Sequence, residues 1–98
     1  GAGAYNVSLT GGSNSIAGAT TFSNTGTVTL GDQNTDSTTF VGGVTATAPS
    51  AKNIAGTIAA TTGASVINLG TSAVTVTDSA VVGGAATGAI TLGNATIA

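Results

Sequence analysis

The stretch that most constrains this chain runs from Gly26 to Gly31 and reads Gly-Thr-Val-Thr-Leu-Gly. Its apolar residues, Val28 and Leu30, alternate with threonines, and a glycine stands at each end. Alternation with a period of two is typical of a β-strand that buries one face. The pattern returns at residues 65–70 and 88–93, and in a looser form at 4–11. We therefore expect short strands joined by glycine-rich corners.

The composition favours an all-β fold. Only Asp32, Asp36, Lys52 and Asp78 are charged among the 98 residues, whereas disordered chains usually carry many charges. Threonine, valine and isoleucine are abundant and favour strands. Large apolar side chains are sparse, with two Phe, one Tyr and no Trp or Met. Regular backbone hydrogen bonding and repetition must therefore carry much of the structure, because a conventional core would be thin.

The charge pattern excludes several classes of partner. The formal net charge of −2 offers no basic patch for nucleic acid or an anionic membrane. No apolar run approaches the roughly 20 residues of a membrane helix, so we expect no membrane insertion. The absence of cysteine excludes a disulfide framework, which is compatible with the extracellular location that we expect on other grounds below.

Three sequence markers recur in the same order. Ile-Ala-Gly occurs at 16–18 and 54–56, Leu-Gly at 30–31 and 69–70, and Val-Gly-Gly at 41–43 and 82–84. Thr-Thr-Phe recurs at about half that spacing, at 20–22 and 38–40. We interpret residues 1–98 as a single repeat module with internal repeats at 16–53 and 54–94, each repeat comprising two coils.

These spacings predict a β-solenoid, a parallel β-helix-like fold with about 20 residues per coil. The alternative is an antiparallel β-sandwich of the fimbrial-subunit type. The repeat spacing places Val28 and Ile67 in one stack of the solenoid. The side chains that we expect to point inward are Phe22, Val28, Leu30, Phe40, Ile67, Leu69, Ile90 and Leu92.

The ends of the sequence favour a longer array. Ile97 and Ala98 begin a further Ile-Ala-Gly marker, which Gly1 of a following copy would complete. Through that seam the chain would divide into five coils of about 20 residues each. The chain also starts without methionine, so we expect an excerpt of a tandem array.

The repeats resemble the β-strand modules of very large bacterial surface proteins of the adhesin or filamentous-haemagglutinin type. The resemblance lies in residues 19–22, which lead into 26–32, and in 37–40 and 53–57. It covers nearly the whole chain and implies an elongated, extracellular protein with a structural or adhesive role. It supplies no catalytic residues.

One stretch has the opening of a calcium loop. Asp32, Asn34 and Asp36 place oxygen-bearing side chains at alternate positions. Ser37 stands where an EF-hand needs glycine, and the sequence contains no glutamate. A polar turn after Gly31 is the competing interpretation. Calcium is the only cofactor for which the sequence offers ligands.

Two surface features suggest binding alternatives. Thr-x-Thr pairs, which form ice-binding rows on some solenoids, occur at residues 27–29, 45–47 and 75–77. The pairs are unequally spaced and do not give one pair per coil, and threonine is favoured in strands in any case. Asn-x-Ser/Thr sequences begin at Asn6 and Asn94 and are candidate sites for an attached glycan.

No constellation supports catalysis. The chain lacks histidine, cysteine and glutamate, so its serines have no usual activating base. We therefore expect a non-enzymatic structural subunit that self-associates end to end into a filament, surface layer or matrix fibre. A ligand-binding adhesin module and an ice-binding solenoid are the alternatives. The residues expected at the assembly contact are uncharged: Gly1, Ala2, Ala4, Tyr5, Thr96, Ile97 and Ala98.

Overall fold

The chain folds into short parallel strands. The computed structural model describes residues 3–86 and 88–97. Every strand pair within this described part is parallel, which excludes the antiparallel sandwich. The strands are β1 (Val7–Leu9), β2 (Asn14–Ile16), β3 (Thr20–Thr21), β4 (Thr27–Leu30), β5 (Ser37–Phe40), β6 (Val44–Thr45), β7 (Ala51–Ala59), β8 (Ile67–Asn68), β9 (Ala73–Gly83), β10 (Ile90–Thr91) and β11 (Asn94–Ile97).

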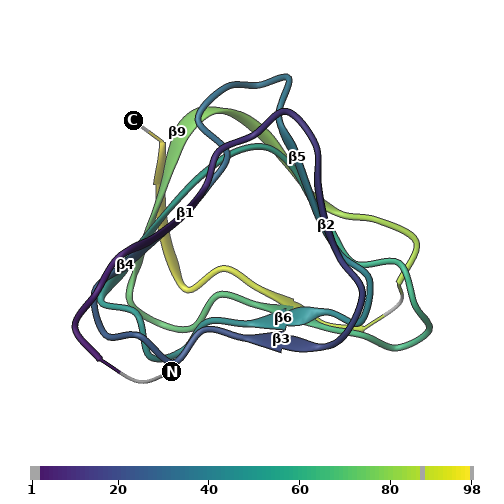
Figure 1. Ribbon diagram of the computed structural model, residues 1–98, viewed down its shortest axis with the longest axis horizontal. Helices are drawn as coiled ribbons and strands as arrows, with labels where there is room; N and C mark the ends of the chain where they lie inside the picture. The colour runs from purple at the N-terminus through teal and green to yellow at the C-terminus, as the bar shows by residue number, and fades with distance from the viewer. Residues whose placement is uncertain (1–2, 87, 98) are drawn as a thin grey trace.

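The strands stack on the three sides of a triangle, which makes the protein a β-solenoid (Figure 1). The first face contains β1, β4, the first part of β7, the first part of β9, and β11. The second face contains β2, β5 and the later parts of β7 and β9, because both long strands bend through the corner. The third face contains β3, β6, β8 and β10.

The spacing between paired residues on neighbouring strands gives the number of residues in one coil. Stacked positions are 7, 28, 52, 74 and 95 on the first face, 14, 38, 58 and 82 on the second, and 21, 45, 68 and 91 on the third. One coil therefore takes roughly 22 residues, within the range of solenoid repeats. The described residues form four coils and one further strand, so the predicted division into five coils is wrong.

The sequence repeats do not coincide with the coils. Val28 lies on the first face and Ile67 on the third, although the repeat spacing predicted one stack. Val28 stacks instead between Val7 and Lys52. The spacing of the markers is longer than one coil and shorter than two, so equivalent markers in the two repeats arrive at different faces.

The inward side chains form one narrow core along the solenoid. Val28, Leu30, Phe40, Ile67 and Leu69 are buried as predicted, and their exposed fractions do not exceed 2%. Phe22 and Leu92 are half-buried and pack against this core. The rings of Phe22 and Phe40 meet edge to face, with centroids 6.0 Å apart, which is a favourable aromatic geometry.

The predicted burial of Ile90 is wrong. Its side chain is 48% exposed, although it stacks in register on Ile67, which is 2% exposed. Ile90 has the inward orientation of its ladder, because stacked residues of parallel strands share one side of the sheet. It belongs to the last coil, however, and no described strand covers β10.

Glycines allow neighbouring corners to approach closely. Gly56 lies where β7 bends between the first and second faces, and its φ is +72°. A Cβ atom there would overlap the carbonyl oxygen of Asp36 in the corner below. Glycine is therefore required both by the left-handed backbone and by the space. The described part of the chain contains no helix that is long and apolar enough to cross a membrane.

Candidate functional sites

The predicted calcium loop is a protruding corner between β4 and β5. Asp36 points into this loop and is 6% exposed. Its Oδ2 atom accepts the backbone N–H of Asp32 at 2.9 Å and that of Gln33 at 3.2 Å. Its carbonyl oxygen accepts the N–H of Thr57 in the next coil. Asp36 therefore closes the turn and connects it to β7. This is what we expect if the stretch is a polar turn.

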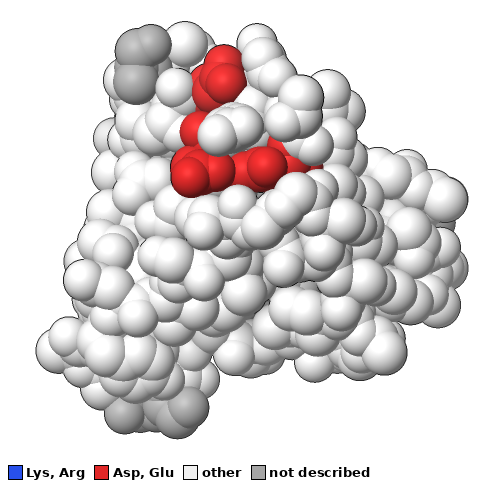
Figure 2. All heavy atoms as spheres, turned by 45° about the horizontal axis from the view of Figure 1, so that its top comes forward, with Lys and Arg blue, Asp and Glu red and all other residues white. Residues whose placement is uncertain are grey.

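The structure adds a third carboxylate to this corner. The Oδ2 atom of Asp78, in the bend of β9, accepts the backbone N–H of Asn34 at 2.9 Å. Asp32, Asp36 and Asp78 consequently gather on one region of the surface (Figure 2). Asp78 was not predicted from the sequence, although it follows Asp32 by about two coils. Only a correct coil length could have revealed this proximity.

Two carboxyl groups of this corner influence each other. Hydrogen bonding to the Asp36 side chain raises the pKa of Asp32, and burial and the charge of Asp36 add to the effect. The backbone N–H of Asp32 lowers the pKa of Asp36, helped by the Asp32 side chain and the N–H of Gln33. The Asp36 carboxyl therefore loses its proton at a lower pH than the Asp32 carboxyl.

This pair can be compared with catalytic carboxyl pairs. Enzymes separate the pKa values of neighbouring carboxyls to obtain an acid and a base. Here, however, one oxygen of Asp36 is engaged by two backbone donors. Of the three acids, Asp78 alone lines the hollow that the structure has in this region. The turn geometry accounts for the pair without any reaction.

The acidic corner provides only part of a metal site. Asn34 contributes its backbone N–H to Asp78, and Oδ2 of Asp36 is occupied by two amide donors. Among the residues that the structure describes, no three acidic, histidine or cysteine side chains are arranged to hold a metal ion. Calcium binding by Asp32, Asn34 and Asp36 stays a prediction. Titration of calcium into a chelated sample tests it, and an unchanged Tm would remove it.

The single cation of the chain lies inside the solenoid. Lys52 is 0% exposed and stacks between Val28 and Val74 on the first face. Its Nζ atom donates to Oγ of Ser72 at 2.6 Å, and that hydroxyl donates to the carbonyl oxygen of Pro49 at 2.7 Å. Burial lowers the pKa of Lys52, because an apolar environment disfavours the charged form.

The outward positions form polar ladders. On the first face, stacked outward residues are Ser8, Thr29, Asn53, Thr75 and Thr96. On the third face, they are Thr21, Thr45, Asn68 and Thr91. Counting Thr-x-Thr pairs along the chain does not reveal these ladders, because their members stand one coil apart.

The Thr-x-Thr pairs do not form one array. The pair at 27–29 lies on the first face, whereas Thr45 of the pair at 45–47 lies on the third. In the pair at 75–77, Thr75 is on the first face, but Thr77 lies in the bend of β9 and donates its hydroxyl to the carbonyl of Ile54 at 3.4 Å. The three pairs therefore do not line up as a double row of hydroxyl groups on one face.

The predicted assembly residues lie at the two ends of the stack where they are described. Thr96 and Ile97 pair with Thr75 and Val76 as part of β11, and the Ile97 side chain is 76% exposed. At the other end Ala4 is exposed and Tyr5 is 44% exposed. Gly1, Ala2 and Ala98 lie outside the described residues.

The fold and these sites define a β-solenoid with an acidic corner, polar outer ladders and apolar terminal coils. Comparisons with protein-family models, curated proteins and solved structures gave no significant match to this chain. The function must therefore be inferred from the physical properties of the residues described above.

Proposed function

We propose that this chain is a structural module of an extracellular filament, surface layer or matrix fibre, assembled end to end through strand pairing. The observation that carries the proposal is the apolar character of the terminal coil. Ile97 is 76% exposed and Ile90 48% exposed, whereas their stacking partners Val76 and Ile67 are half-buried and buried. A further strand on this end would remove these side chains from water.

Charge patterning supports the same proposal. Edge strands of soluble monomers are commonly protected by charged side chains or proline. β10 and β11 contain neither, and neither do β1, β2 and β3 at the opposite end. Asp32, Asp36 and Asp78 lie together at one corner of the solenoid (Figure 2), and among the described strands that are open at the C-terminal end, β9 alone has a charged residue, Asp78. The proposal assigns no reaction to the chain.

Association of the purified chain tests this function. Light scattering over a range of protein concentrations should show growth beyond the monomer mass, and electron microscopy should show elongated particles. Ile97→Lys places a charge on the apolar end and should suppress association. Thr61→Lys adds the same charge at an exposed corner position in the middle of the stack and should leave association unchanged. A chain that stays monomeric at high concentration with both ends uncovered would contradict the proposal.

The outer ladders support a second candidate, a ligand-binding or ice-binding surface module. The first face presents a row of hydroxyl and amide groups one coil apart, and Nδ2 of Asn53 lies 3.5 Å from Oγ1 of Thr29 within it. Thermal hysteresis and glycan-array binding measure these activities. If the row is the binding surface, Thr29→Tyr should abolish either activity without affecting the fold, since the side chain points outward from the sheet.

A further inference from the structure

One corner of the solenoid joins three successive coils. Residues 31–36 form this corner in the second coil, between β4 and β5. Gly56 forms it in the third coil, and the carbonyl oxygen of Asp36 lies against Gly56. The loop then reaches the fourth coil, where Oδ2 of Asp78 accepts the backbone N–H of Asn34 at 2.9 Å. The loop therefore connects coils that are two apart, whereas each strand ladder connects coils that are adjacent.

β9 carries extra residues at this corner. In the register of the two long strands, the single residue Ala55 of β7 lies opposite the three residues 77–79 of β9. Such a bulge bends its strand and redirects the side chains within it. Asp78 is the middle residue of the bulge, and its exposed carboxylate is directed at the loop of the second coil. The bulge therefore lengthens the corner of the fourth coil and brings Asp78 to the loop.

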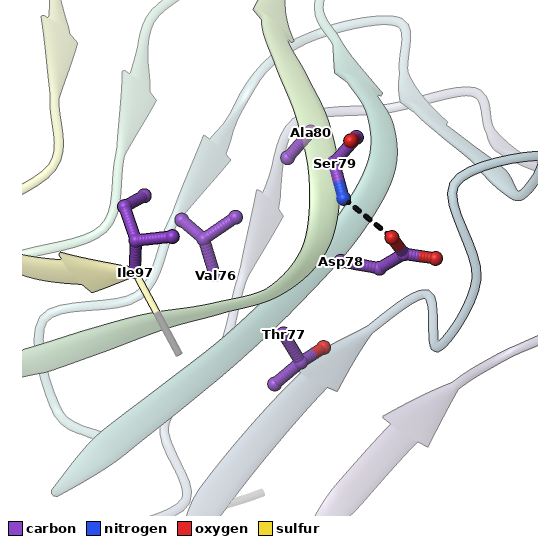
Figure 3. Close-up of a pocket in the computed structure, with 6 residues that line it drawn as sticks. All are labelled: Val76, Thr77, Asp78, Ser79, Ala80 and Ile97. Carbon is purple, nitrogen blue, oxygen red and sulfur yellow. Dashed lines mark hydrogen bonds between the residues drawn. The ribbon is translucent and has the colours of Figure 1, made fainter.

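Hydrogen bonds, rather than close packing, hold the bulge in place. A hollow of about 470 Å³ is lined by Val76, Thr77, Asp78, Ser79, Ala80 and Ile97. Figure 3 shows the Asp78 carboxylate turned to the N–H of Ser79, which Oδ1 accepts at 2.8 Å. Both hydrogen bonds of the Asp78 carboxylate are exposed to solvent, so they compete with water. The contact between the loop and the bulge can therefore open locally while the coils stay folded.

Closure of this contact brings like charges together. Asp32, Asp36 and Asp78 are all the acidic residues of the sequence, and they share this corner (Figure 2). The single cationic side chain, Lys52, is buried inside the solenoid and compensates none of them. The hydrogen bond from the loop to Asp78 acts at short range and favours closure, whereas repulsion among the carboxylates acts at longer range and opposes it. Dissolved salt screens the repulsion more than the hydrogen bond, so salt should favour closure.

We propose that residues 31–36 form a latch that closes on Asp78 of the β9 bulge, and that ionic strength controls its closure. At high ionic strength Asn34, at the tip of the loop, is bound to Asp78 and holds the bulge in position. At low ionic strength repulsion separates the two, while the carboxylate of Asp36 keeps the turn itself closed. The latch operates within one chain, so it goes beyond the proposed function and does not depend on association.

The amide proton resonance of Asn34 reports the state of the latch, because a hydrogen-bonded amide proton resonates downfield of a free one. In the unsubstituted chain this resonance should move downfield as sodium chloride is raised from about 0.01 M to about 1 M, a range over which the Debye length falls from about 30 Å to about 3 Å. A chelator in the sample removes divalent cations, so the response reports screening alone. A resonance that stays fixed or moves upfield would overturn the control by ionic strength.

Two substitutions of Asp78 separate its roles as acceptor and as charge. Asp78→Ala removes the acceptor and should leave the Asn34 resonance upfield at every salt concentration. Asp78→Asn keeps an oxygen acceptor without the charge and should lose most of the salt response. Thr75→Ala is the matched control, since it removes an outward hydroxyl from the same strand outside the bulge, and it should respond like the unsubstituted chain. An unchanged response in Asp78→Ala would overturn the latch, and an unchanged response in Asp78→Asn would overturn repulsion as its cause.

Discussion

The side chain of Lys52 can carry a charge, yet it is fully buried. Its pKa is lowered from the ordinary value of 10.5, so the unfolded chain binds a proton more readily than the folded one. Unfolding free energy should therefore rise with pH between the lowered pKa and 10.5. Lys52→Met has a similar length and no charge. It should lose this pH dependence and change stability at pH 7 by about 0 to 2 kcal/mol in the stabilising direction.

Urea unfolding at several pH values, carried out on both proteins, measures the effect. The comparison isolates Lys52, because every other titrating group is shared. Parallel pH profiles for the two chains would mean that the lysine side chain is solvated in the folded protein. The hydrogen bond from Nζ to Ser72 would then lie outside the core, contrary to its 0% exposure.

The interaction between Asp32 and Asp36 predicts that substitutions at these two residues have opposite effects on stability. The pKa of Asp36 is lowered, so its stabilising contribution is present above its unfolded value of 3.8 and is lost as the pH falls through the folded value. The pKa of Asp32 is raised, so its contribution is present below 3.8 and is lost as the pH rises through its folded value. Ionised Asp32 thus opposes ionised Asp36.

Asp32→Asn should accordingly raise the Tm at pH 7, because a neutral amide removes the repulsion between the two carboxylates and can donate to Asp36. Asp36→Asn should lower the Tm at pH 7, because a neutral oxygen replaces the carboxylate that accepts the N–H groups of Asp32 and Gln33. Thermal unfolding at pH 7 and pH 3 measures both changes. The same sign for the two variants at pH 7 would be inconsistent with this pairing.

At the scale of the element, the corners decide how closely the coils stack. Gly56→Ala introduces a Cβ into the carbonyl oxygen of Asp36 at a φ of +72°. The left-handed backbone alone should cost about 1–2 kcal/mol of unfolding free energy, and the overlap should add to it. Gly12→Ala is the matched control, since an added Cβ meets no atom within 4 Å there. Chemical denaturation of both variants distinguishes them, and equal losses would contradict the close approach.

The strands were predictable from the sequence, whereas their stacking was not. The alternation around Val28 and Leu30 depends only on the extended conformation of the local backbone. β4 spans Thr27–Leu30, as that pattern predicts. The coil length depends on the number of residues in each corner. The shorter of two examples is the single residue Ala55 between the paired parts of β7, and the longer is the loop 31–36 between β4 and β5. A marker spacing cannot reveal such variation, so the register was assigned wrongly.

The same limitation explains what was missed at the sites. Residues 48–53 contain Pro49, which favours a corner because proline cannot donate to a strand ladder, yet β7 begins at Ala51 and turns Lys52 inward. Proline occupies the corner without preventing a strand two residues later. Asp78 was unrecognised because its proximity to Asn34 crosses two coils. The turn-closing role of Asp36, in contrast, follows from the local sequence, because aspartate favours such turns.

At the scale of the whole molecule, the register of the stacked strands determines which side chains point inward and which lie next to each other. The inward burial of Lys52 and the outer polar ladders both follow from the pairing of strands one coil apart. A stack set by the sequence repeats would instead align Thr29 with Asn68, because it superimposes Leu30 on Leu69. The two registers therefore assign different neighbours to the same outward threonine.

Paired cysteines distinguish these registers directly, because the chain has no cysteine of its own. Neighbouring residues on parallel strands lie about 4.8 Å apart, within the Cα separation of roughly 4.4–6.8 Å that a disulfide requires. Thr29→Cys with Asn53→Cys joins register partners on the first face, and mass spectrometry after mild oxidation should show a disulfide within one chain. Thr29→Cys with Asn68→Cys places the thiols on different faces and should show none. A disulfide in the second protein but not in the first would contradict the register and the assignment of strands to faces derived from it.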